Sequence, residues 1–238
     1  MTFSRGFYRS VAVCSVLSAG TTLLLIFMPR LFAPGASFDA RMARVNETAY
    51  IVRAWAYLVH PFLAVAAAAG VAASLRRKAG GIVSLGFLGF LLWGFTEAAQ
   101  QALTVVAFDR WRRAYLVAEE PARAVLRAQI GVYDAVWDSM FLLLLIAFLI
   151  GNLLYGLVLL REDVLGRIVG FFYFAAAGLT LTDLLGEFQV KVLPEALEFW
   201  IYPALQPLAR VLIGVWLWRV APEVSGEPTA SRPSSART

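Results

Sequence analysis

The chain has 238 residues, of which 60% are hydrophobic and only 16% charged, and its mean hydropathy is +0.71. Soluble domains average about 45–50% apolar and about 25% charged residues, so this composition excludes an ordinary soluble domain and a disordered chain. The net charge of +5 does not indicate nucleic-acid binding, because the basic residues are scattered between apolar stretches, as is usual in membrane proteins.

Six apolar stretches follow one another along the chain, at residues 11–28, 49–75, 81–108, 132–160, 168–188 and 199–218. Each is close to the roughly 20 residues that a membrane-spanning helix needs, and lipid leaves the backbone no hydrogen-bond partner outside a helix. The sequence therefore predicts an all-α, polytopic membrane helix bundle, with one domain of six transmembrane helices at residues 1–220. Residues 221–238 are rich in Ser, Pro and Thr and are predicted to be a disordered cytoplasmic tail.

The segments between the apolar stretches predict the orientation. Short basic turns at 76–80 and 161–167 lie on the same side as both termini, and short basic loops favour the cytoplasm. We therefore predict cytoplasmic termini in a bacterial inner membrane. On the other side, residues 36–48 and 115–130 are longer; Phe38, Met42 and Val45 have helical spacing, so both segments are predicted to lie in the membrane interface.

Polar residues recur on one face of five predicted helices, in the half of the bilayer opposite the termini. Charged groups at this depth are costly and usually face a bundle interior or a wet cavity. Prolines follow three of the polar residues, at Pro61, Pro203 and Pro207, and the last two predict a kinked or broken sixth helix. The sequence predicts one shared ligand-binding cavity lined by His60, Glu97, Gln101, Asp138, Asp183, Tyr202, Gln206 and Arg210.

The charges of the embedded residues predict which ligand this cavity attracts. Six carboxylates face two arginines, Arg53 and Arg210; the carboxylates belong to Glu97, Asp134, Asp138, Asp183, Glu187 and Glu198. Unpaired carboxylates in a low dielectric take up a proton or recruit a cation. A structural interpretation stays open, in which Gln101 joins helices by hydrogen bonds and Arg210 pairs with Asp183 or Glu97 solely to specify the fold.

Three functional hypotheses are compatible with this pattern. The first is binding or transport of a proton, a cation or a small cationic or amphiphilic ligand. The second is an intramembrane enzyme that uses Glu97, Asp138 and Asp183 for acid–base chemistry on a lipid-like or isoprenoid substrate. The third is a non-catalytic subunit that binds partner membrane subunits. With one histidine and one cysteine, the sequence contains no metal-ligand motif and predicts no particular cofactor.

Overall fold

The computed structural model describes residues 3–32, 37–190, 192 and 194–224, apart from the side chains of 195–200, 202 and 222–224. Helices dominate these residues and no strand occurs among them, which confirms the predicted all-α class. The elements are α1 (Arg5–Phe27), η1 (Met28–Leu31), α2 (Phe38–Ala43), η2 (Arg44–Asn46), α3 (Thr48–Leu103), η3 (Thr104–Phe108), α4 (Asp109–Val117), α5 (Ala122–Leu159), α6 (Val164–Glu187) and α7 (Glu195–Val224).

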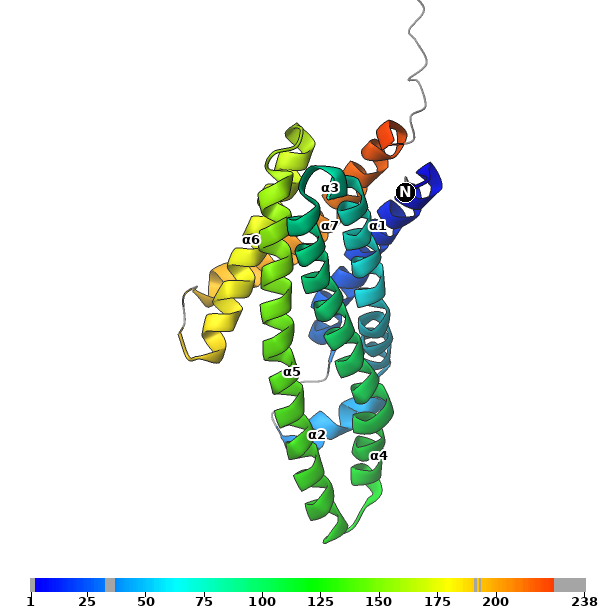
Figure 1. Ribbon diagram of the computed structural model, residues 1–238. Coiled ribbons are helices and arrows are strands. Elements are labelled where there is room, and N and C mark those ends of the chain that lie inside the picture. The colour runs from blue at the N-terminus through cyan, green and yellow to red at the C-terminus, as the bar shows by residue number, and fades with distance from the viewer. Residues whose placement is uncertain (1–2, 33–36, 191, 193, 225–238) are drawn as a thin grey trace, which may run out of the picture.

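Four helical stretches in the described part of the chain are long and apolar enough to cross a membrane: Arg5–Leu31, Thr48–Val117, Ala122–Leu159 and Val164–Glu187. The protein is therefore a multi-pass membrane protein. The stretch Thr48–Val117 contains two of the predicted spans, because the α3 backbone leaves helical geometry at Ala79, with φ −149° and ψ 49°. Figure 1 shows the two arms of α3 running in opposite directions from this turn. The total of six spans remains a prediction.

The helix ends gather as the sequence pattern predicts. The start of α1, the turn of α3, the α5–α6 turn and the end of α7 lie at one end of the molecule, whereas α2 and α4 lie at the other (Figure 1). Ser4 and Asp163 begin α1 and α6 by accepting hydrogen bonds from the backbone N–H groups of Phe7 (3.2 Å) and Gly166 (2.8 Å). We call the end with the termini the near end and the other the far end.

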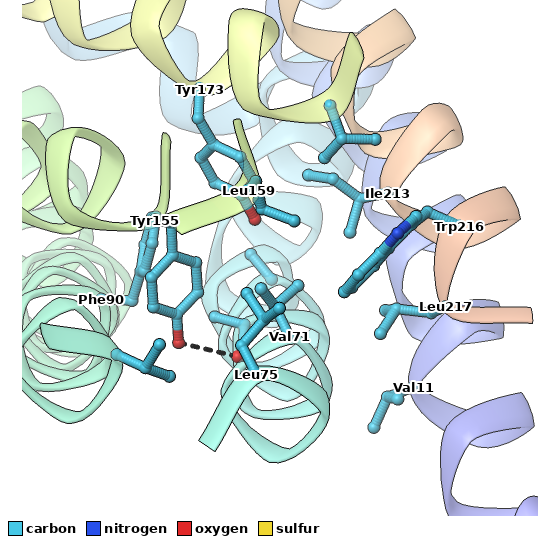
Figure 2. Close-up of a cluster of buried hydrophobic side chains, with 14 of the residues drawn as sticks. Val11, Val71, Leu75, Phe90, Tyr155, Leu159, Tyr173, Ile213, Trp216 and Leu217 are labelled. Atoms are coloured by element: carbon cyan, nitrogen blue, oxygen red, sulfur yellow. Dashed lines mark hydrogen bonds between the residues drawn. The ribbon is translucent and has the colours of Figure 1, made fainter. Parts of the chain in front are cut away.

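A mostly apolar core joins α1, α3, α5, α6 and α7 towards the near end. Tyr155 of α5 is fully buried, and its hydroxyl donates to the backbone carbonyl of Ala68 in α3 at 2.9 Å (Figure 2). Gly89 lets α3 and α5 approach closely, since a Cβ there would lie 2.9 Å from both the Ala147 carbonyl oxygen and the Gly151 nitrogen. Small residues at such crossings are the usual means of packing membrane helices tightly.

The far end differs from the prediction. At about 1.5 Å per residue, the 38 residues of α5 extend about 57 Å, well beyond a hydrocarbon core of about 30 Å. Residues 115–130 are largely helical, and 36–48 form α2 and η2 where described. Met42 and Val45 have no exposed surface, and Met42 packs with Phe108, Tyr115 and Ile130. These segments form a packed cap that buries Met42 and Val45 inside the protein, and their position in the membrane interface stays a prediction.

The last helix also corrects the sequence reading. The α7 backbone is helical without interruption from Glu195 to Val224, through Pro203 and Pro207. The helix is therefore not broken at these prolines, and the kink that they predict stays a prediction. Each proline removes only one backbone donor, and neighbouring helices can satisfy the carbonyl that is freed in a membrane helix.

Candidate functional site

Two adjoining cavities lie on the far side of the apolar core. The inner cavity has a volume of about 220 Å³ and contains four of the predicted site residues, with lining residues Thr22, Leu25, Ile26, Arg53, Tyr57, His60, Trp93, Glu97, Phe141, Leu144, Leu145, Phe148, Thr180, Gln206 and Arg210. The outer cavity has a volume of about 460 Å³ and is lined by Arg41, Tyr50, Arg53, Tyr57, Gln101, Thr104, Phe108, Arg112, Tyr133, Asp134, Trp137 and Asp138. Arg53 and Tyr57 line both cavities and therefore stand between them.

Hydrogen bonds fix the protonation pattern of His60 in the inner cavity. Its Nε2 lies 3.0 Å from Nη2 of Arg210, and its Nδ1 lies 2.8 Å from the Thr21 hydroxyl. A guanidinium only donates hydrogen bonds, so Nε2 must be the accepting nitrogen and Nδ1 carries the ring proton. The Nδ1–H then donates to the Thr21 hydroxyl, which in turn donates to the Ser18 carbonyl at 3.0 Å.

This chain of hydrogen bonds ties together α1, α3 and α7. The Ser15 hydroxyl of α1 donates to the backbone carbonyl of Arg210 in α7 at 2.6 Å, and Nη1 of Arg210 lies 3.5 Å from the Ser18 hydroxyl. His60 is 3% exposed and sits one residue before Pro61 in the first arm of α3. Arg210 is thereby held at the polar end of the inner cavity from two helices.

Glu97 occupies a different position in the same cavity. Its side chain is 5% exposed and comes from the second arm of α3. No hydrogen bond or ion pair from any described residue reaches its carboxylate. Burial of an ionised carboxylate without a partner costs several kcal/mol or more, which makes Glu97 the most unusual side chain of the inner cavity.

The shared wall between the cavities consists of a cation–π pair. The Arg53 guanidinium lies 5.1 Å from the centroid of the Tyr57 ring, and Nε of Arg53 donates to the Leu25 carbonyl at 3.3 Å. These contacts hold Arg53 between α1 and α3. Its two terminal nitrogens make no hydrogen bond with the described residues, so they remain available to either cavity.

The outer cavity is built from a network of arginines, tyrosines and aspartates. Tyr50 donates to the Asp109 carboxylate at 2.7 Å, and Arg112 lies 3.4 Å from the same carboxylate oxygen. Arg41 pairs with Asp134 at 2.9 Å. The π-helix η3 places the Thr104 hydroxyl 2.6 Å from the hydroxyl of Tyr133. Short π-helical turns are frequent at functional sites.

The predicted site residues divide between these cavities. His60, Glu97, Gln206 and Arg210 line the inner cavity, whereas Gln101 and Asp138 line the outer one. Asp183 lines neither, and the side chain of Tyr202 lies outside the described residues. The eight residues therefore do not all share one cavity.

The predicted excess of carboxylates is not found among the described lining residues of the inner cavity. Glu97 is its one carboxylate among the described lining residues, whereas Arg53 and Arg210 contribute two guanidinium groups. Asp138 and Glu187 are exposed, and Asp134 pairs with Arg41 in the outer cavity. The three acids assigned to acid–base chemistry are also separated, because Glu97, Asp138 and Asp183 do not line a common cavity.

Sequence reasoning missed two groups of residues. Ser15, Ser18 and Thr21 of α1 support Arg210 and His60, and their spacing of three was a usable signal, because it places them on one helical face. Tyr50 and Asp109 were missed because they lie near the ends of predicted spans, where a polar side chain is expected to be solvated.

Comparisons with known proteins add no family. No protein-family model, no curated protein and no solved structure matches this chain. The function is therefore argued from the two cavities.

Proposed function

We propose that this membrane protein binds a small amphiphile in the inner cavity, with a cationic head group on Glu97 and an apolar body between the hydrophobic walls. The observation that carries the proposal is the buried carboxylate of Glu97, which has no partner among the described residues and lines a cavity of about 220 Å³. This volume is far above the roughly 10–15 Å³ that one water molecule requires.

The walls support an amphiphile over a bare ion. Apolar side chains from α1 and α5 line much of the cavity: Leu25, Ile26, Phe141, Leu144 and Phe148. These side chains have no atom that could coordinate a cation. An apolar pocket with a few polar groups is typical of sites for small organic molecules. An alkyl chain gains free energy from contact with such walls, while its ammonium group supplies the hydrogen bonds that Glu97 lacks.

Arg210 contributes selectivity in this proposal. Its guanidinium is held by His60 and Ser18, and no hydrogen bond or ion pair joins it to Glu97 among the described residues. Arg210 and Arg53 repel every cation that pairs with Glu97, and they repel a dication more strongly than a monocation. The proposal therefore favours singly charged amines. Acid–base catalysis by paired carboxylates is not favoured, because Glu97 lacks a second acid in its cavity.

The experiment is calorimetric titration of the purified protein, in maltoside detergent, with hexylammonium and with hexanol. Loss of one hydrogen bond to a charged group costs about 1.5–3 kcal/mol, so Glu97→Gln should weaken hexylammonium binding at least about tenfold. Asp138→Asn is the matched control, because this acid is exposed and lines only the outer cavity, and it should leave the affinity unchanged. Hexanol should bind more weakly than hexylammonium to the wild type.

Two results would contradict the proposal. Equal hexylammonium affinity in the wild type and in Glu97→Gln would remove Glu97 from the site. Equal affinity of hexanol and hexylammonium for the wild type would show that the cavity recognises an alkyl chain without its charge.

A further inference from the structure

The outer cavity presents N–H donors that the protein does not use. Three arginines from three elements line it: Arg41 of α2, Arg53 of α3 and Arg112 of α4. A guanidinium carries five N–H groups. Nη1 of Arg41 and both terminal nitrogens of Arg53 make no hydrogen bond within the described residues.

The acceptors of the same cavity are largely engaged. The Asp109 carboxylate, next to the cavity, accepts from Tyr50 and Arg112, and Asp134 accepts from Arg41. Asp138 is the remaining lining carboxylate, and its side chain is exposed. Arg41 pairs with Asp134 and Arg112 with Asp109, so Arg53 is the lining arginine that has no ion pair among the described residues.

Two uncharged donors add to these unused N–H groups. The Gln101 side chain is 6% exposed, and Tyr57 lines the cavity beside Arg53. Neither side chain makes a hydrogen bond to a described residue. Buried polar groups are almost always paired, so unused donors from several helices around one cavity indicate a missing acceptor.

We propose that the outer cavity is a binding site for a phosphate group, carried by a lipid head group or free in solution. A phosphate offers several acceptor oxygens and negative charge, and arginine guanidinium groups match its geometry with two parallel hydrogen bonds. The volume of about 460 Å³ accommodates a phosphate with part of a head group. Such a site is distinct from the amine site at Glu97 and does not rest on it.

The position of the cavity agrees with a lipid source. The outer cavity lies at the far end of the helices that cross the membrane, and Trp137 is among its lining residues. Tryptophan is enriched at the level of the lipid head groups. A phosphate at this level is within reach of α2, α3 and α4 together.

The test is a ³¹P nuclear magnetic resonance titration of delipidated protein in maltoside, with dihexanoyl phosphatidylglycerol and, separately, with inorganic phosphate. Binding broadens the phosphorus signal. The variants are Arg53→Gln and Arg112→Gln, and the matched control is Arg77→Gln, an exposed arginine at the near end. We expect broadening with the wild type and with Arg77→Gln, and an affinity at least about tenfold lower in Arg53→Gln.

Each outcome decides one part of the proposal. Broadening by the lipid alone assigns a head-group site, and broadening by both probes assigns a site for phosphate itself. The absence of broadening with either probe overturns the proposal, as does an affinity that is unchanged in Arg53→Gln. Arg53→Gln decides the result if Arg112→Gln fails to fold, because Arg53 makes one hydrogen bond to a backbone carbonyl, a cation–π contact with Tyr57 and no ion pair with the described residues.

Hexylammonium titration of the same variants separates the two sites. Arg53→Gln should leave hexylammonium binding at least as strong as in the wild type, and Glu97→Gln should leave phosphate binding unchanged. Failure at one cavity is therefore distinguishable from failure at the other.

Discussion

The inner and outer cavities share Arg53 and Tyr57 but leave opposite groups unsatisfied. In the inner cavity, Arg210 and His60 direct N–H donors to protein acceptors, and a carboxylate is left at Glu97. At the outer cavity, Asp134 and the adjacent Asp109 accept hydrogen bonds from the protein, and terminal guanidinium N–H groups of Arg41 and Arg53 make no hydrogen bond within the described residues. Arginines and acids occur in both cavities. The cavities differ in which of these groups already have a hydrogen-bond partner in the protein.

This comparison changes the meaning of the embedded charges. A count of acids and arginines predicts a cavity that attracts cations, but it treats every carboxylate as available. Asp134 is already paired with Arg41, and Asp109 already accepts from Tyr50, whereas Glu97 has no such partner among the described residues. The ligand chemistry of a cavity therefore follows from its unused hydrogen-bonding groups, and each cavity is tested by removing one of them.

The largest effect is expected from Arg210→Met in the inner cavity. This change leaves Nε2 of His60 without its donor and removes a charge that Ser18 and His60 orient. Breaking a buried charged hydrogen-bond network typically costs about 3 kcal/mol or more. Urea or thermal unfolding in detergent should show this loss of unfolding free energy.

The single histidine provides a specific control for that variant. Since His60 is the chain's one histidine, ¹⁵N-histidine labelling yields one imidazole. Wild-type protein should show an unprotonated Nε2 and a protonated Nδ1, and Arg210→Met should lose this fixed pattern. A protonated Nε2 in the wild type contradicts the arrangement.

The next largest effect is expected in the outer cavity, from Tyr50→Phe. Tyr50 and Asp109 are both buried, and the hydroxyl donates to the carboxylate at 2.7 Å. Loss of a hydrogen bond to a charged group costs about 1.5–3 kcal/mol, because Asp109 then keeps only the long contact with Arg112. Thermal unfolding is the measurement, with Tyr133→Phe as a comparison at a neutral hydrogen bond to Thr104. A smaller loss for Tyr50→Phe than for Tyr133→Phe would contradict the argument.

Glu97→Gln is expected to act in the opposite direction. Burial of a carboxylate without a partner is costly, and a neutral amide of similar shape lowers that cost. The free energy of unfolding of the ligand-free variant should therefore be about 1–2 kcal/mol higher than that of the wild type. Asp138→Asn, at an exposed acid, should change the unfolding free energy by less than about 0.5 kcal/mol. Destabilisation by Glu97→Gln would mean that the carboxylate is already satisfied, and would remove the premise of the amine site.

Much of the fold was predictable because it depends on local sequence properties. Each long apolar stretch is helical in the structure, and the basic residues before Gly80 coincide with the turn at Ala79. The extensions at the far end were not predictable from hydropathy, because residues 109–130 are rich in charged groups and read as a loop. Their helices are held by the packing of Tyr115 and Ile130 with Met42, which lies about 70 residues or more away in sequence.

The sequence predicted how deep the site residues lie along each span, but not towards which cavity each side chain points. Counting residues along each span placed His60 and Glu97 in the same half of the bilayer and Arg210 near its midplane, and all three line one cavity. Asp138 has a similar depth on α5, but it faces the outer cavity. Rotation of a helix about its axis depends on close contacts such as Gly89 against Gly151, which a hydropathy pattern does not contain.

The smallest effect is expected from Asp134→Asn, at the rim of the outer cavity. The Arg41–Asp134 pair is close, at 2.9 Å, but its side chains are 41% and 38% exposed. Solvent screens such a pair, so its contribution is about 0.2–1 kcal/mol, far below that of the buried Arg210 network. A double-mutant cycle with Arg41→Gln measures the coupling, which should fall further in high salt because exposed charges are screened. A coupling above about 2 kcal/mol that persists in high salt would show that the outer cavity is as sheltered from water as the inner one. The two cavities would then have similar access to solvent, and they would differ only in which hydrogen-bonding groups lack a protein partner.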